Sequence, residues 1–77
     1  MTNYMRNFVR SMNTMFENNS CTNNGRVRIQ YVHRDLAGWV IEVRVLDDKR
    51  LINPDAYTDF GLMMAIMRQV DLMYNAH

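Results

Sequence analysis

The fold is decided by the stretch RVRIQYVHRDLAGWVIEVRV at residues 26–45. Apolar and polar residues alternate with a period of two on both sides of its centre, which is typical of β-strands with one buried side. The centre itself, DLAG, has an aspartate first and a glycine last, as a type I turn prefers. The stretch therefore predicts a β-hairpin with strands at 26–34 and 39–45, in which Asp35 pairs with Trp39.

The two faces of this hairpin differ in character. The face expected to be buried carries Val27, Ile29, Tyr31, His33, Trp39, Ile41, Val43 and Val45. The opposite face carries Arg26, Arg28, Gln30, Val32, Arg34, Val40, Glu42 and Arg44. Because Glu42 lies among arginines on this second face, we expect it to pair with Arg28 or Arg44 across the strands.

Helices are expected on both sides of the hairpin. Apolar residues recur at three- and four-residue steps from Thr2 to Glu17, and again from near Tyr57 to Asn75. Thr58 or Asp59 is expected to cap the second helix, because either side chain can accept a hydrogen bond from an unpaired backbone N–H. The polar stretch at residues 18–25 is rich in turn-forming residues and separates the first helix from the hairpin.

The segment between the hairpin and the second helix leaves one alternative open. DDKR at residues 47–50 predicts a second turn, and Leu51-Ile52 either does or does not add a short strand before Pro54. The residues therefore predict an α+β fold: a helix, a β-hairpin with or without a short third antiparallel strand, and a helix, with both helices packed on one face of the sheet. With a length of 77 residues, we expect a single small domain over residues 1–77.

This order of elements is similar to that of the double-stranded-RNA-binding domain, which runs helix, three strands, helix. That family places a lysine-rich motif at the start of its last helix. The equivalent stretch here, Asp55 to Gly61, carries two acids. The resemblance therefore concerns topology and transfers no function to any residue.

The second helix carries more apolar residues than one buried stripe needs. They form one stripe of Phe60, Met63, Met67, Val70 and Tyr74 and an adjacent stripe of Leu62, Ile66 and Met73. We expect Met64 and Leu72 to stay exposed when the core is filled, together with either Leu62 or Met73. Eight methionines in the chain support this interpretation, because flexible thioether side chains adapt well to partner surfaces. The predicted dimer or protein interface consists of Leu62, Met64, Ile66, Leu72 and Met73.

Basic residues are concentrated in the first half of the chain. Up to Arg34 there are five basic residues and one acid, whereas from Asp35 onward there are four and seven. Guanidinium groups match phosphate and carboxylate geometry, so this half offers a basic surface for a macromolecular partner. The candidate binding residues are Arg6, Arg10, Arg26, Arg28, Arg34 and Arg44.

No catalytic motif is present in the sequence. It lacks a Gly-rich phosphate loop, a nucleophile elbow and a His-Glu-x-x-His metal helix. A single cysteine, Cys21, excludes an internal disulfide framework and a multi-cysteine zinc site. His33 could act as a base or a pH switch, but catalysis would need an acid or a nucleophile beside it. We expect no catalytic residue, no cofactor and no metal.

These features favour a small non-enzymatic interaction protein that forms a homodimer and binds a larger protein. Chains of this size without catalytic motifs are often phage or mobile-element accessory proteins that inhibit or redirect a host macromolecular machine, and we predict such a role. The alternative is a nucleic-acid-binding regulator that uses the arginine-rich sheet face, which steep salt dependence would reveal. No apolar run approaches the roughly 20 residues of a membrane helix, so we expect no membrane partner and a cytoplasmic location.

Overall fold

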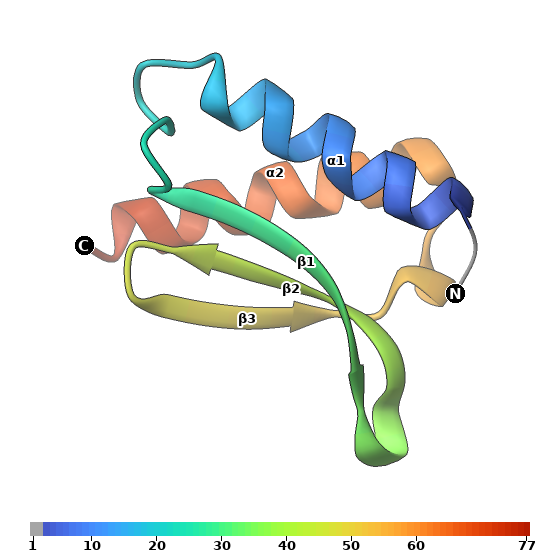
Figure 1. The fold of residues 1–77 in the computed structure, drawn as a ribbon. Helices are drawn as coiled ribbons and strands as arrows, with labels where there is room; N and C mark the ends of the chain where they lie inside the picture. The colour runs from blue at the N-terminus through green and yellow to red at the C-terminus, as the bar shows by residue number, and fades with distance from the viewer. Residues whose placement is uncertain (1–2) are drawn as a thin grey trace.

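The described part of the chain is a three-stranded antiparallel sheet with both helices on one side, as the computed structural model of residues 3–77 shows (Figure 1). In chain order the elements are α1 (Asn3–Glu17), β1 (Val27–Arg34), β2 (Gly38–Val45), β3 (Asp48–Ile52) and α2 (Asp59–Asn75). The strands lie in the order β1-β2-β3; α1 packs on β1, and α2 packs on β2 and β3. The predicted α+β fold is thus confirmed, and the third strand is present. Thr2, where we expected the first helix to begin, lies outside the described residues.

The hairpin closes one residue earlier than predicted. Arg34 pairs with Gly38, so the predicted pairing of Asp35 with Trp39 is wrong. A three-residue 3₁₀ turn, Asp35–Ala37, connects the strands, and the N–H of Gly38 donates to the carbonyl oxygen of Asp35. Gly38 has a φ of 73°, which a residue without a Cβ adopts at little cost. Each residue of β1 therefore meets a partner two positions earlier than expected, and this even shift leaves every side chain on its predicted face.

The connection between β2 and β3 is shorter than predicted. Val45 lies opposite Asp48 in the sheet, so only Leu46 and Asp47 form the turn, and the predicted turn at residues 47–50 is wrong. The charged residues that suggested a turn belong instead to an edge strand. Charged side chains are common on edge strands, because they discourage pairing with other chains.

Leu46 adopts an unfavourable backbone conformation in this turn. Its φ is 57°, and a side chain with a Cβ pays about 1 kcal/mol or more in this left-handed region. We expect Leu46→Gly to raise the free energy of unfolding by about 0.5–1 kcal/mol, measured as the midpoint of urea unfolding. Leu46→Ala is the matched control, because it removes the exposed side chain but keeps the Cβ. Equal stabilisation by both substitutions would contradict the explanation from backbone strain.

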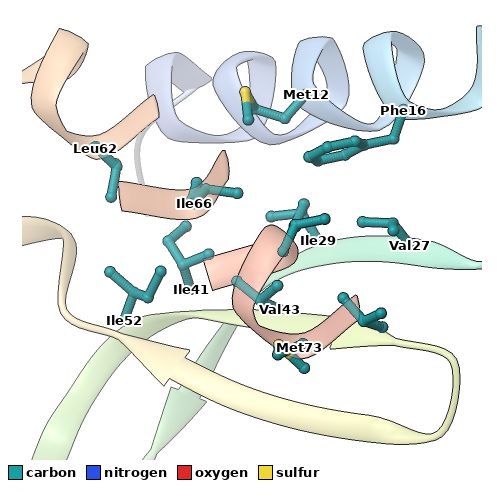
Figure 2. Packing of buried hydrophobic residues seen from close by; sticks show 12 residues of the cluster. Met12, Phe16, Val27, Ile29, Ile41, Val43, Ile52, Leu62, Ile66 and Met73 are labelled. Atoms are coloured by element: carbon teal, nitrogen blue, oxygen red, sulfur yellow. The ribbon is translucent and has the colours of Figure 1, made fainter. Parts of the chain in front are cut away.

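The hydrophobic core lies between the sheet and the two helices (Figure 2). Its buried members are Met12, Phe16, Val27, Ile29, Ile41, Val43, Val45, Ile52, Leu62, Ile66, Val70 and Met73. The α2 members are spaced three and four residues apart, which places them on one side of the helix. Figure 2 shows Leu62 and Ile66 pointing toward the sheet, opposite Ile41 and Ile52. Filling this core determines which side of α2 is left to solvent.

The start of α2 is held by its own cap and by α1. The Thr58 hydroxyl accepts a hydrogen bond from the N–H of Gly61 at 3.1 Å, so the prediction of Thr58 as a cap is confirmed. The carboxylate of Asp59, in the first turn of α2, raises the pKa of the Tyr4 phenol of α1 through a hydrogen-bonding interaction, with desolvation and the nearby negative charge as smaller causes. The N-terminal half of α1 is therefore linked to the beginning of α2.

Candidate functional site

The side of α2 that faces away from the sheet is largely apolar. Helical spacing places Met64, Met67, Arg68, Asp71 and Leu72 opposite the buried stripe, and all five are exposed. Met64 is 51% exposed and Leu72 is 60% exposed. We call these five residues the outward α2 surface. Three large apolar side chains share it with one cation and one anion.

The structure corrects the predicted interface at three of its five positions. Leu62, Ile66 and Met73 are 3%, 0% and 2% exposed, so the prediction that they form an interface is wrong. The reason is that these three residues pack in the core together with Val70, whereas Phe60 and Met67 of the other predicted stripe stay exposed. Met64 remains in the candidate surface, as does Leu72.

An open groove adjoins the outward α2 surface. It has a volume of about 680 Å³ and is lined by residues of α2 together with Ile52 of β3 and Tyr57. Tyr57 is 48% exposed. The apolar surface therefore extends from α2 toward the β3 edge of the sheet.

The solvent face of the sheet carries a row of three cations. Arg28 of β1 lies directly opposite Arg44 of β2, and Arg44 lies directly opposite Lys49 of β3. We call these three residues the cationic row. They line a hollow of about 140 Å³ together with Gln30 and Glu42. The Nε atom of Arg44 is buried and has no hydrogen-bond partner within residues 3–77.

Among the described strand residues of this face Glu42 is the one acid, and its side chain is only 7% exposed. One carboxylate oxygen accepts a hydrogen bond from Nη2 of Arg34 at 2.6 Å, and the other lies 3.6 Å from Nζ of Lys49. The prediction that Glu42 pairs with Arg28 or Arg44 is therefore wrong. Gln30 occupies the position opposite Glu42 on β1, so the carboxylate reaches Arg34 at the end of that strand instead.

The other predicted arginines do not join the cationic row. Arg6 and Arg10 lie on α1, on the helix side of the sheet, where they line an open pocket of about 380 Å³ beside Tyr31. Arg26 precedes β1 and donates a hydrogen bond to the carbonyl oxygen of Ser20 at 3.0 Å. Of the six predicted arginines, Arg28 and Arg44 thus remain as a pair without a carboxylate partner among the described residues on the solvent face of the sheet.

His33 lies against an aromatic ring. Its ring centroid is 5.4 Å from that of Trp39 in an edge-to-face arrangement, and Tyr31 stacks on the same indole at 5.2 Å. Within residues 3–77 no acid or nucleophile forms a hydrogen bond or ion pair with His33. His33 therefore packs against an aromatic side chain, as a histidine at the end of a hydrophobic core does.

Residues with metal-binding or nucleophilic side chains stay apart. No group of three or more His, Cys, Asp or Glu side chains that could hold a metal ion occurs in the described part of the chain. Cys21 is exposed in the loop before β1, and its carbonyl oxygen accepts a hydrogen bond from the Tyr74 hydroxyl. Sequence reasoning missed Lys49 as a site residue, because the predicted turn at residues 47–50 concealed its place in the sheet.

Comparisons with protein-family models, with curated proteins and with solved structures found no match. Among the described helices, neither has the length and apolar character needed to cross a bilayer.

Proposed function

We propose that the chain is a non-enzymatic interaction protein that pairs with a second copy of itself through the outward α2 surface. The observation that carries this proposal is the exposure of Met64, Met67 and Leu72 on a helix whose other side already fills the core. Contiguous exposed apolar side chains on a small domain mark a contact surface. Methionine suits such a surface, because its unbranched side chain adapts to the shape that it meets.

The charges of the outward α2 surface support a second copy as the occupant. Arg68 and Asp71 are its only charged residues, so the surface has no net charge and does not repel itself. In an antiparallel pair of α2 helices with a two-fold axis beside Gln69 and Val70, Arg68 of one copy meets Asp71 of the other. In the same arrangement Met67 meets Leu72 of the second copy, and each contact occurs twice, as two-fold symmetry requires.

Pairing through α2 leaves the solvent face of each sheet free, because that face lies on the far side of the molecule from the helices. A dimer of this kind presents two cationic rows to a macromolecular partner. Nucleic-acid binding through this face is the second candidate function, and the cationic row is the observation that favours it. The predicted role of a phage or mobile-element accessory protein rests on size and the absence of motifs, and it stays a prediction.

Met67→Glu is expected to weaken the dimer at least tenfold. The new carboxylate lies against Leu72 and near Asp71 of the second copy. Loss of the apolar contact between Met67 and Leu72 costs about 1.4 kcal/mol or more. The measurement is light scattering at several protein concentrations, in low and in high salt. Leu36→Glu is the matched control, because Leu36 is fully exposed at the hairpin tip. A wild-type protein that is monomeric at every concentration would contradict the proposal.

A charge exchange tests the antiparallel arrangement separately. Arg68→Asp and Asp71→Arg each place like charges together across the proposed interface, so each is expected to weaken the dimer. The double variant restores opposite charges and is expected to recover most of the wild-type affinity. If the losses of dimer affinity in the two single variants simply add in the double variant, with no recovery, this pairing of the helices is ruled out.

A further inference from the structure

Repulsion between like charges in the cationic row destabilises the sheet, and Glu42 offsets it only at Lys49. Antiparallel strands lie about 4.8 Å apart, and like charges directly opposite one another destabilise a sheet. Arg28 faces Arg44, which faces Lys49. Within residues 3–77, neither Arg28 nor Arg44 takes part in an ion pair. An anion bound to this row would compensate the repulsion.

The hollow beside the row provides a place for such an anion. Its volume of about 140 Å³ suits a small polyatomic group, and both arginines line it. Buried N–H donors are normally hydrogen-bonded, yet Nε of Arg44 has no partner in the described part of the chain. A ligand with several acceptor oxygens can accept from Arg44 and Arg28 together.

Glu42 organises the surroundings of the hollow. Its buried carboxylate lies 3.6 Å from Nζ of Lys49 and accepts a hydrogen bond from Arg34. This arrangement restrains two long side chains that would otherwise be mobile. Four cations, Arg28, Arg34, Arg44 and Lys49, then surround one acid, so the face keeps a positive net charge.

The composition of this face favours nucleic acid over protein as the ligand. Protein interfaces are built around exposed apolar and aromatic residues, whereas Leu51 is the one large exposed apolar side chain described on this side of the sheet. Single-stranded nucleic acid binds to aromatic platforms, but Tyr31, His33 and Trp39 lie on the helix side. A polar cationic surface without aromatic residues suits the phosphate backbone of a duplex.

We propose that the solvent face of the sheet binds the phosphate backbone of double-stranded nucleic acid through Arg28, Arg44 and Lys49. This inference deepens the second candidate function and does not depend on pairing through α2. The guanidinium groups of Arg28 and Arg44 contact phosphate oxygens in bidentate geometry, each with two parallel hydrogen bonds. Lys49 adds a point charge. The site reads no base sequence, since contacts to phosphate carry no sequence information.

The test uses the full chain and fluorescently labelled duplex DNA, duplex RNA and single-stranded DNA of mixed sequence, with fluorescence anisotropy as the readout. Three neutralised phosphates give a slope of about −3 for log affinity against log salt concentration. Arg28→Gln and Arg44→Gln are each expected to reduce that slope by about 1 and to weaken binding equally on different sequences. Arg28→Lys is expected to keep the slope.

Arg10→Gln is the matched control, because it removes one positive charge from an exposed residue on the helix side of the sheet. An equal loss of slope in Arg10→Gln and Arg28→Gln would overturn the proposal. Single strands that bind as tightly as duplexes, or a poly-glutamate peptide that binds more tightly than either, would also overturn it. The DNA and RNA arms distinguish the two kinds of duplex.

Light scattering on the same samples separates this inference from the α2 proposal. A monomer that binds duplexes with the expected slope would contradict only the pairing of α2. A dimer without salt-dependent binding would contradict only the site on the sheet. Far-ultraviolet circular dichroism of each variant confirms that any lost affinity does not come from unfolding.

Discussion

Replacing Ile66 with alanine is expected to lower the free energy of unfolding by about 4 kcal/mol. Ile66 is 0% exposed and lies at the centre of the stripe that joins α2 to the sheet. Alanine removes the buried side chain and leaves a cavity that the closely packed neighbours can fill only in part. Small domains have a total unfolding free energy on the order of 5–10 kcal/mol, so much of the stability is lost.

Urea unfolding measures this loss, with circular dichroism and the fluorescence of Trp39 as two independent probes. Wild type and variant are compared at one protein concentration, because self-association shifts apparent stability. Leu36→Ala is the control, since Leu36 is fully exposed and its truncation is expected to change stability by about 0.5 kcal/mol or less. Similar losses in both variants would mean that α2 does not present Ile66 to the core.

Replacing Asn13 with alanine is expected to cost about 2–3 kcal/mol. Asn13 on α1 forms two hydrogen bonds with the backbone of Ile29: its Nδ2 donates to the carbonyl oxygen at 2.8 Å, and its Oδ1 accepts from the N–H at 2.8 Å. β1 is an edge strand, so one side of its backbone has no neighbouring strand. The side-chain amide takes the place of such a strand at Ile29.

Two measurements distinguish the loss of these two hydrogen bonds from the general effect of an Asn→Ala substitution on α1. Urea unfolding of Asn13→Ala is compared with that of Asn7→Ala, because Asn7 is exposed on the same helix. Amide hydrogen exchange at Ile29 is expected to accelerate in Asn13→Ala and to stay unchanged in Asn7→Ala. An unaltered exchange rate at Ile29 in Asn13→Ala would show that the amide is protected by something other than Asn13.

The two sides of α2 connect these stability predictions with function. Ile66 and Met64 are two residues apart, yet one is completely buried and the other is half exposed. Substitutions on the buried side are expected to unfold the domain, whereas substitutions on the outward α2 surface are expected to change association alone. A change in oligomeric state without a change in secondary structure therefore identifies the second kind.

Sequence reasoning identified part of each candidate surface. Met64 and Leu72 were predicted on the outward α2 surface, and Arg28 and Arg44 on the solvent face of the sheet. Met67 was missed, because an almost uniformly apolar helix has no polar side that would show which stripe faces the sheet. The alignment of Arg28, Arg44 and Lys49 across the sheet depends on the pairing of three strands. It could therefore not be predicted from the sequence of any single strand.

Residue patterns alone were enough to predict the two strands of the hairpin, the faces of those strands and the two helices, whereas they left the third strand open. Alternation with a period of two across residues 26–45 assigns each side chain to a face, and a shift of two residues in the pairing leaves that assignment intact. For the same reason the alternation could not determine the register, which is fixed by the three-residue turn Asp35–Ala37 between Arg34 and Gly38. The residues of α2 that fill the core and the cations that meet across the sheet follow from the three-dimensional fold alone, because both depend on packing between segments that are distant in sequence.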